Sequence, residues 1–187
     1  MSQFSNNLNS SKASFQNAKV FWLTGLPCSG KSTLANALTE TLRITGLKVE
    51  QLDGDAVRKF YPKLGFSKEE RNLHIMQMAL LASVLEKNGI TVVASFVSPY
   101  EESRKFVREH CENFIEIYVS TALHECEKRD VKGMYKKARS GEISSFTGVD
   151  DPYEVPVSPE LAIDTLGRSV ENCIEEIVNY LQVRTMI

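Results

Sequence analysis

The sequence has no excess of basic residues: 22 lysines and arginines stand against 24 aspartates and glutamates, a formal net charge of −2. A nucleic-acid-binding protein needs surplus cations to neutralise phosphates, so this balance argues against a nucleic-acid partner. The sequence also lacks an uninterrupted apolar run of the roughly 18 residues that a membrane-spanning helix requires. We therefore expect neither a nucleic-acid nor a membrane partner.

Cysteine is scarce, and its spacing excludes two kinds of site. The four cysteines form no Cys-x-x-Cys pair and are Cys28, Cys111, Cys126 and Cys173. This pattern predicts neither a metal site nor a disulfide framework, and it is typical of reduced thiols in the cytoplasm. Cys28 precedes a predicted helix, where a thiol is more reactive, so it is either a redox-sensitive thiol or simply a small loop residue.

Apolar residues are also sparse at the start of the chain. Residues 1–18 are rich in Ser, Asn and Gln and contain no apolar segment, a composition that excludes a signal or transit peptide. We expect residues 1–18 to form a disordered tail. Residues 19–187 have the length of one domain, and the sequence contains no internal repeat.

The clearest motif follows the apolar segment Val20–Thr24, which we expect to be a buried strand. This segment leads into Gly-x-x-x-x-Gly-Lys-Ser, and helical periodicity begins directly afterwards. In such a phosphate-binding loop, backbone N–H groups and a helix N-terminus hold a polyphosphate. Lys31 would reach the β- and γ-phosphates, and the Ser32 hydroxyl would bind Mg²⁺. The predicted nucleotide-binding residues are Gly25, Leu26, Pro27, Cys28, Ser29, Gly30, Lys31, Ser32 and Thr33.

Strand and helix patterns alternate along the rest of the chain. Apolar, β-branched segments predict strands at 48–52, 90–96, 114–119 and 161–165. Helical spacing predicts helices after Lys31, from Ser67 to Asn88, at about 101–110 and at 170–181. Ser67 and Glu70 form a capping box at the start of the second of these. The alternation predicts an α/β fold of three layers: a mostly parallel central sheet with helices on both faces.

Two carboxylates follow the second predicted strand, in the sequence Asp53-Gly54-Asp55. Ligands of parallel α/β sheets bind beyond the carboxyl ends of the strands, and the phosphate-binding loop lies at the same edge. The pair is therefore well placed for metal or proton chemistry, with a surface turn as the alternative. The sequence leaves open which carboxylate would bind a metal and which would act on a proton.

The composition changes between Glu125 and Asp151, where basic residues are crowded between glycines. The residues concerned are Lys128, Arg129, Lys132, Lys136, Lys137 and Arg139, with Gly133, Gly141 and Gly148. Behind a phosphate-binding loop, this pattern predicts a mobile basic lid at about residues 129–151 that closes over phosphates and excludes water. For Lys136 and Lys137, an ordinary solvated helix face is the alternative.

A phosphate-binding loop alone does not separate kinases from GTPases and ATPases. The sequence has no Asn-Lys-x-Asp motif, with which a GTPase would recognise guanine. Asp130 and Gly133 match Asp-x-x-Gly, but they lie in the lid, where no switch strand precedes them. A motor or transporter ATPase would need a longer chain. The chain length, the lid and the acidic pair favour a small-metabolite kinase.

Further motifs make the sequence resemble the adenylylsulfate kinase family. They occur in the family's order and cover about Phe21 to Pro159. They are Leu52-Asp53-Gly54-Asp55-x-x-Arg58, Leu64-Gly65-Phe66-Ser67-x-x-x-Arg71, Ser98-Pro99-Tyr100, the lid segment 126–139, and the segment 146–154. The resemblance implies the three-layer fold of a P-loop kinase and a homodimer. It also implies an ATP- and Mg²⁺-dependent activity that phosphorylates the ribose 3′-hydroxyl of adenosine 5′-phosphosulfate. The product would be 3′-phosphoadenosine 5′-phosphosulfate.

The resemblance also implies roles for individual residues. Lys31, with Mg²⁺ at Ser32 and Asp53, would neutralise the transferring phosphoryl group, while Asp55 would orient or deprotonate the 3′-hydroxyl. A guanidinium fork matches anionic oxygens, which suits Arg58 and Arg71 to the phosphosulfate. The other implied substrate contacts are the adenine-stacking pair Phe66 and Phe146, the lid residue Lys132, and Val97, Ser98 and His74.

Ser98 has three interpretations. It matches a position described in some family members as a phosphoserine intermediate. We expect direct in-line transfer instead, with Ser98 and the Val97 backbone as substrate contacts. Ser98 could also cap the helix that begins after Pro99, alone or in addition to that role.

One segment departs from the family pattern. Where the family has Glu-Asn-Ile-Arg-Arg, this sequence has Leu73-His74-Ile75-Met76-Gln77, so His74 replaces a substrate-contacting asparagine and two arginines are absent. His74 could bind substrate in a pH-dependent way or be an ordinary partly buried helix histidine. Two other functions therefore stay open: a kinase of the same fold for a different nucleotide conjugate, and a nucleotide-binding regulator with weak or no catalysis.

Overall fold

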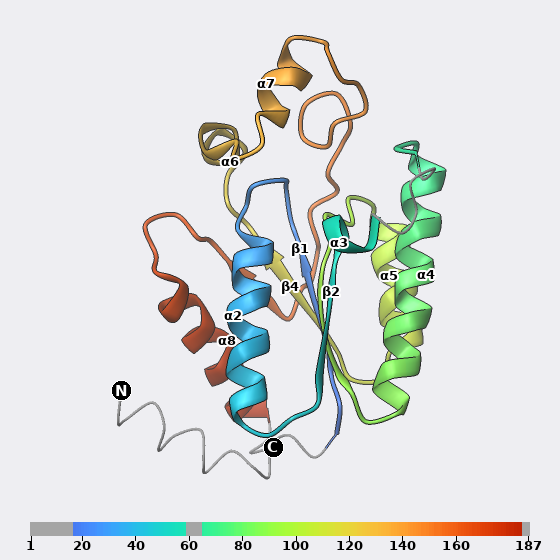
Figure 1. The fold of residues 1–187 in the computed structure, drawn as a ribbon, viewed down its shortest axis with the longest axis vertical. Coiled ribbons are helices and arrows are strands. Elements are labelled where there is room, and N and C mark those ends of the chain that lie inside the picture. The colour runs from blue at the N-terminus through green and yellow to red at the C-terminus, as the bar shows by residue number, and fades with distance from the viewer. Residues whose placement is uncertain (1–16, 59–64, 185–187) are drawn as a thin grey trace.

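The computed structural model describes residues 17–58 and 65–184, so nearly all of the predicted tail lies outside the described residues. The described residues form a five-stranded sheet in the order β2-β3-β1-β4-β5. Its strands are β1 (Val20–Thr24), β2 (Val49–Asp53), β3 (Thr91–Ser95), β4 (Phe114–Val119) and β5 (Leu161–Ile163). Each pairing between these strands is parallel, as the sequence predicted. The strand before the phosphate-binding loop, β1, is the middle one (Figure 1).

Two pairs of helices cover the two faces of the sheet (Figure 1). Helices α2 (Lys31–Ile44) and α8 (Val170–Arg184) pack on one face, and α4 (Lys68–Lys87) and α5 (Glu101–His110) pack on the other. Successive side chains of β1 point to opposite faces, so Leu23 packs with the first pair and Trp22 with the second. Both faces are buried, which explains why the first four residues of β1, Val20 to Leu23, are apolar. The predicted three layers are confirmed.

The capping box at the start of α4 forms as predicted. The Glu70 N–H donates to Ser67 Oγ at 3.2 Å, and the Ser67 N–H donates to Glu70 Oε2 at 3.0 Å. Two backbone donors that a helix start would leave without acceptors are thereby satisfied. The helix places Ile75, Met78, Ala79 and Ala82 in the core against the sheet.

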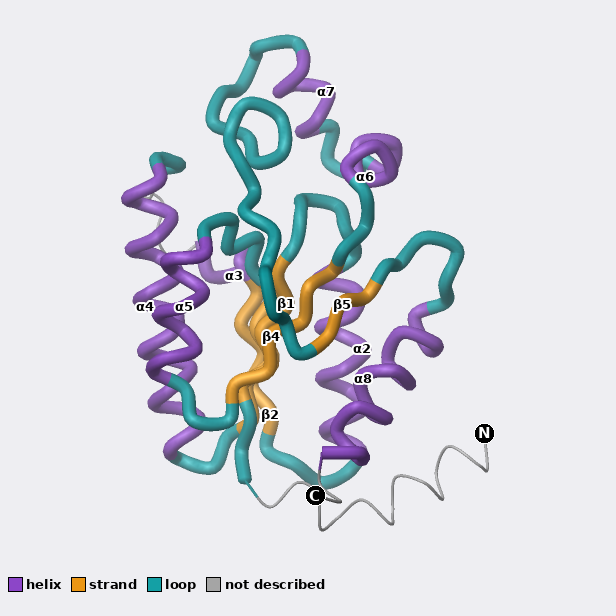
Figure 2. Tube along the Cα trace, turned by 180° about the vertical axis from the view of Figure 1, so that it is seen from behind, coloured by secondary structure: helices purple, strands orange, loops and turns teal. Residues whose placement is uncertain are grey.

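The carboxyl ends of the strands meet at one edge of the sheet. Strand β2 leads there into the short helix α3 (Gly54–Arg58), and β4 leads into α6 (Leu123–Arg129) and α7 (Met134–Arg139). Figure 2 shows α6, α7 and the loop after them beyond this edge, where the lid was expected. In the described ranges, no helix is long and apolar enough to cross a membrane.

Candidate active site

The phosphate-binding loop runs from the end of β1 to the start of α2, and protein donors hold its carbonyl groups. The Pro27 carbonyl accepts from the Tyr135 hydroxyl of α7 at 3.0 Å. The Ser29 carbonyl accepts from the hydroxyls of Thr121 and Thr165, each at 3.0 Å, and from Arg129 Nη1 at 3.3 Å. These bonds fix the loop against α6, α7 and the segment after β5, at the N-terminus of α2, which is where proteins commonly bind a phosphate.

Gly25 is required by the packing of this loop. Its φ is +150°, and a Cβ built on it would lie 2.5 Å from the carbonyl oxygen of Val119 on β4. That oxygen belongs to the backbone of a central strand, so it cannot move aside as a flexible side chain would. The strand register therefore dictates a glycine here, independently of any ligand.

We expect Gly25→Ala to lower the free energy of unfolding by about 2–4 kcal/mol, because the β1–β4 packing must open. Gly141→Ala is the matched control: Gly141 also has a positive φ, +75°, but nothing lies within 4 Å of its Cβ position. The control should cost about 1 kcal/mol, from backbone strain alone. Urea unfolding measures both variants, and equal losses would contradict the assigned clash.

Lys31 is buried at the start of α2, with 8% of its surface exposed. Its Nζ donates to the Leu26 carbonyl at 2.6 Å and lies 3.4 Å from Ser29 Oγ. Burial lowers the pKa of the Lys31 ammonium to about 8, with nearby acidic groups opposing the shift only partly. The fold therefore holds a poorly solvated cation over the loop, where a polyphosphate would stabilise its charged form.

Asp53 ends β2 beside Ser32. Its Oδ2 accepts from Ser32 Oγ at 2.9 Å and from Ser95 Oγ at 2.8 Å, and its Oδ1 accepts from the N–H groups of Asp55 and Ala56. Burial acts to raise the pKa of Asp53, but these hydrogen bonds outweigh it and hold the pKa below its ordinary value. The carboxylate is therefore fixed and ionised.

The residues at this point fit a magnesium ion. A hydroxyl and an ionised carboxylate supply the hard oxygen ligands that Mg²⁺ prefers, and such sites take their other ligands from phosphates and water. Among the residues that the structure describes, no group of three or more His, Cys, Asp or Glu could hold a metal ion without a nucleotide. The ligands predicted from the sequence, Ser32 and Asp53, are thus brought together.

Asp55 projects from α3 and forms an ion pair with Lys132, in the turn between α6 and α7. Both side chains are mostly exposed, 69% for Asp55 and 62% for Lys132, so the pair contributes at most about 1 kcal/mol. The contact brings the basic residue Lys132 next to the second carboxylate of the Asp53-Gly54-Asp55 segment. Asp53 is fixed by four donors, whereas Asp55 is exposed. The structure thus gives the two carboxylates different environments.

Arg58, Phe66 and Arg71 form a cluster beside α3 and the start of α4. The guanidinium carbons of Arg58 and Arg71 lie 4.1 and 5.3 Å from the centroid of the Phe66 ring. Phe66 is 54% exposed, so its ring is accessible from solvent beside the two guanidinium groups. Two cations and an exposed aromatic face make this a surface suited to an anionic, planar ligand.

Arg71 also ties the start of α4 to the end of the lid. Its Nε donates to the Phe66 carbonyl at 2.8 Å, its Nη1 to Thr147 Oγ1 at 3.0 Å, and its Nη2 to the Ser145 carbonyl. Phe146, between these two lid residues, contacts the Tyr135 ring edge-on at a centroid distance of 4.9 Å. The sequence-predicted residues Phe66, Arg71 and Phe146 are thereby linked through the Arg71 side chain.

His74 is on the buried face of α4, with 4% of its surface exposed. Its ring meets Phe96 edge-on at 5.9 Å, and Phe96 stacks on Trp22 of the sheet. Burial, and then the charge of Arg58, lower the pKa of His74, so the ring is neutral at pH 7. This placement favours the interpretation of His74 as a core histidine behind the site.

The loop after β3 contains Val97 and Ser98. The Val97 carbonyl accepts from Thr24 Oγ1 at 2.7 Å, and Ser98 Oγ accepts from Trp22 Nε1 at 2.9 Å. The alternative interpretation of Ser98 as a helix cap is wrong: α5 begins at Glu101, and its N-cap residue is Tyr100. The Glu101 N–H donates instead to Glu154 Oε2, because the returning lid segment supplies the acceptor from 53 residues away.

Sequence reasoning did not assign a pocket that lies beside the N-terminus of α2. Its volume is about 190 Å³, and it lies between α2, the end of α6 and the segment after β5. The lining residues are Gly30, Thr33, Leu34, Arg129, Thr165, Arg168, Ser169, Val170 and Cys173. The signal was present, since Thr165 follows the carboxyl end of a parallel strand, where ligands bind.

Comparisons with known proteins identify relatives of this chain. The family model for adenylylsulphate kinase matches residues 17–164. The adenylyl-sulfate kinase of Picosynechococcus sp. (strain ATCC 27264 / PCC 7002 / PR-6) is 47% identical over 161 residues, covering 86% of this chain and 91% of that protein.

Solved structures agree. The Mycobacterium tuberculosis APS kinase CysC in complex with AMPPNP and APS has a TM-score of 0.84 and 35% identity, covering 89% of this chain and 98% of that one. The hexameric APS kinase from Thiobacillus denitrificans has a TM-score of 0.69 and 34% identity, covering 92% of this chain and 30% of that one. This chain therefore belongs to the adenylylsulfate kinase family, whose members are ATP-dependent kinases of adenosine 5′-phosphosulfate.

Proposed function

We propose that this chain transfers the γ-phosphoryl group of ATP directly to the 3′-hydroxyl of adenosine 5′-phosphosulfate, using the residues at the carboxyl edge of its sheet. The observation that carries the proposal is the arrangement around β2. Asp53 is 2.9 Å from Ser32 of the phosphate-binding loop, and Asp55, two residues on, meets the lid at Lys132. In this proposal, the metal-binding carboxylate Asp53 and the acceptor-orienting carboxylate Asp55 are two residues apart, and the lid residue Lys132 contacts the second of them.

In this proposal, ATP binds with its phosphates in the loop Gly25–Thr33 and its nucleoside in the pocket next to α2. Lys31 holds the β- and γ-phosphates. Mg²⁺, held by Ser32 and Asp53 together with phosphate oxygens and water, would neutralise charge that develops on the transferring group. The α2 N-terminus adds its partial positive charge at the same place.

In this proposal, the acceptor nucleotide binds next to Asp55, on the side away from the ATP-binding loop Gly25–Thr33. Phe66 and Phe146 stack its adenine, Arg58 and Arg71 bind the phosphosulfate, and Lys132 closes over it from a mobile lid. Asp55 accepts the hydrogen bond of the 3′-hydroxyl and orients or deprotonates it. Its exposure supports this role over metal binding, since the fixed, four-fold hydrogen-bonded carboxylate is Asp53.

The surroundings of Ser98 support direct transfer over a phosphoserine intermediate. Ser98 is 1% exposed, and its Oγ accepts from Trp22 Nε1 in the core. Phosphorylating this oxygen would require breaking that bond and burying a dianion beside an indole ring. Ser98 and Val97 therefore serve the acceptor as backbone contacts in this proposal.

A panel of acceptors tests the proposal against both alternatives. MgATP is supplied with adenosine 5′-phosphosulfate, adenosine 5′-monophosphate or another 3′-hydroxyl nucleotide conjugate, and acceptor-dependent ADP release is measured. We expect ADP release with adenosine 5′-phosphosulfate. Release only with another conjugate would identify a different acceptor and implicate the His74 region. No acceptor-dependent release at all would support the regulator.

We further propose a homodimer that pairs α4 with α4 of a second copy. Four apolar side chains are exposed on this helix at spacings that place them on one face: Leu73, Leu80, Leu81 and Val84, exposed by 41–57%. The helix has Glu69 and Glu70 in its first turn and Lys87 in its last. An antiparallel pair would therefore place opposite charges together at both ends of the apolar contact, which favours a second copy as occupant.

We expect the wild-type chain to sediment at twice the 21.0 kDa of one chain, and Leu80→Glu to sediment as a monomer. In a dimer of this variant, each copy would bury the unpaired carboxylate introduced at position 80 in the apolar α4–α4 interface, and the cost of burying these charges would prevent dimerisation. Ile44→Glu, at an exposed apolar residue of α2 on the opposite face, is the control and should remain dimeric. Sedimentation velocity decides, and a monomeric wild-type chain would contradict the proposal.

We place the protein in the cytoplasm. The cysteines of the described residues, Cys28, Cys111, Cys126 and Cys173, are free thiols. Thiols that need no disulfide partner are typical of a reducing compartment.

A further inference from the structure

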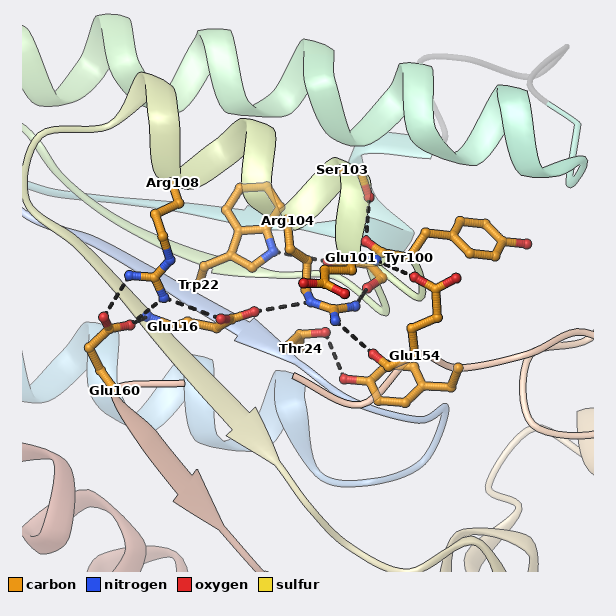
Figure 3. A network of polar contacts seen from close by, with 12 residues as sticks. Trp22, Thr24, Tyr100, Glu101, Ser103, Arg104, Arg108, Glu116, Glu154 and Glu160 are labelled. Carbon is orange, nitrogen blue, oxygen red and sulfur yellow. Dashed lines mark hydrogen bonds and ion pairs between the residues drawn. The ribbon is translucent and has the colours of Figure 1, made fainter. Parts of the chain in front are cut away.

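Arg104 lies in α5 with 3% of its surface exposed, and its guanidinium group meets three different segments (Figure 3). Nη1 donates to the Ser98 carbonyl at 2.7 Å, and Nη2 donates to the Glu154 carbonyl at 2.7 Å. Nε faces Glu116 Oε1 of β4 at 3.1 Å. One buried side chain therefore links the loop after β3, the segment returning from the lid, and the sheet.

The first of these contacts stabilises an unfavourable backbone conformation. Ser98 has a φ of +44°, in the left-handed region that residues with a Cβ adopt at a cost. Two buried donors bind this residue: Trp22 Nε1 donates to the Ser98 hydroxyl oxygen, and Arg104 donates to the Ser98 carbonyl oxygen. The shape of the Val97–Pro99 loop thus depends on donors from β1 and α5.

The second contact secures the segment that follows the lid. The Glu154 N–H donates to the Pro99 carbonyl at 2.8 Å, its carboxylate accepts from the Glu101 N–H at 2.6 Å, and its carbonyl accepts from Arg104. Asp151, three residues earlier, accepts from the Tyr100 hydroxyl at 2.8 Å. The start of α5 and the end of the lid are therefore docked onto each other, with Arg104 beneath both.

The third contact balances the buried charge, and a neighbouring arginine shares it. Glu116 is 6% exposed and accepts from Arg108 Nη2 at 3.2 Å as well as facing Arg104 (Figure 3). Arg108 extends away from the site to Glu160, which it contacts at 2.6 and 2.8 Å. Arg104 and Arg108 thus share a helix and a carboxylate partner, but among the contacts drawn for them only Arg104 reaches the two loops.

We infer that Arg104 is a positioning residue for the acceptor nucleotide. It holds the Val97–Ser98 backbone and the lid segment that ends at Glu154 in one fixed relation, so that the acceptor site is formed before the acceptor binds. A buried ion pair is weak evidence for a stabilising role, whereas one hydrogen bond to each of two loops fixes their relative geometry. The inference rests on the proposed acceptor site, since Val97 and Ser98 are its contacts there.

The test compares Arg104→Lys with Arg108→Lys. Both variants keep a positive charge for Glu116, but a lysine at position 104 cannot donate to Ser98, Glu154 and Glu116 together. We expect Arg104→Lys to raise KM for adenosine 5′-phosphosulfate about tenfold and to leave KM for ATP within about threefold, because only acceptor contacts are displaced. Arg108→Lys should change neither KM by more than about twofold. An unchanged acceptor KM in Arg104→Lys, or an equal rise in Arg108→Lys, would overturn the inference.

A second pair of variants tests the link through Ser98. Ser98→Gly and Ser98→Ala both remove the hydroxyl, but only glycine adopts a positive φ without cost. In the Arg104→Lys background, we expect the glycine variant to recover part of the lost acceptor affinity and the alanine variant to recover none. Equal behaviour of the two would show that Arg104 does not act through the Ser98 backbone.

Hydrogen exchange separates failure of this inference from failure of the proposed function. Amides in segments 97–103 and 151–155 should exchange faster in Arg104→Lys than in the wild type or Arg108→Lys, with no substrate needed. If the wild type does not phosphorylate adenosine 5′-phosphosulfate, the proposed function fails while the exchange result still decides whether Arg104 holds the two loops. Unchanged exchange in both segments would overturn the inference.

Discussion

Replacing Lys31 with alanine should lower kcat/KM for phosphoryl transfer by at least about 10³-fold, since a cation on the transferring group supplies much of the catalysis in such enzymes. The position of Lys31 in the structure fits this role. The Lys31 ammonium is buried over the loop, 2.6 Å from the Leu26 carbonyl, at the N-terminus of α2. Acceptor-dependent ADP release measures the effect, and activity within tenfold of the wild type would contradict the phosphate role of Lys31.

A second variant, Lys31→Met, removes the charge but keeps most of the side-chain volume. It should not lose stability, which separates the catalytic effect of losing the ammonium group from misfolding. The pKa of Lys31 is lowered to about 8 by burial, so the folded protein binds fewer protons than the unfolded chain between about pH 8 and the ordinary lysine range. The free energy of unfolding contributed by this group is therefore lowest below pH 8 and rises with pH through that window. Lys31→Met should remove this pH dependence and be at least as stable as the wild type at pH 7. Urea unfolding at pH 7 and pH 9.5 checks both statements.

Replacing Asp55 with asparagine should lower kcat by about 10²–10⁴-fold and change ATP affinity by less than about threefold. Asparagine keeps the shape of the side chain and removes its ability to accept a proton. Asp55 is 69% exposed on α3, so the change should leave the fold intact. Equal losses of ATP binding and of rate would instead assign Asp55 to the metal.

Two further variants test whether the effect on kcat is specific to the Asp55 carboxylate. Lys132→Met removes the partner of the Asp55 ion pair and tests whether loss of that pair alone explains the fall in kcat. Asp53→Asn changes the carboxylate that Ser32 contacts, and it should raise the Mg²⁺ concentration required for activity. A fall in kcat confined to Asp55→Asn would support separate roles for the two carboxylates.

The parts of this protein that the sequence predicted are those fixed by local chemistry. The capping box is specified by Ser67 and Glu70, which are only three positions apart. Gly25 was found through its place in the local motif Gly-x-x-x-x-Gly-Lys-Ser, although the contact that requires it comes from Val119 of β4. Asp53 and Asp55 lie at the carboxyl edge of the sheet, where the sequence predicted them, because the carboxyl ends of parallel strands meet at one edge.

The unpredicted parts depend on contacts between distant segments. Ser98 has the sequence signature of a helix cap. In the structure, however, the Glu101 N–H at the start of α5 donates to Glu154, and the Ser98 hydroxyl accepts a hydrogen bond from Trp22. Arg104 has the sequence context of an ordinary surface-helix arginine, yet it is buried between β4 and two loops. No spacing rule along the chain encodes such pairings, since they follow from how α5 and the lid segment pack on the sheet.

The position of the transferred phosphoryl group tests the proposed reaction most directly. The chain is incubated with adenosine 5′-phosphosulfate and ATP labelled in the γ-phosphoryl group, and the labelled product is isolated and treated with a 3′-nucleotidase. We expect one labelled product that the nucleotidase converts back to unlabelled adenosine 5′-phosphosulfate, with the label released as phosphate. A labelled product that resists the nucleotidase, or no transfer of label to the acceptor, would contradict the assignment of the 3′-hydroxyl as the group that Asp55 orients.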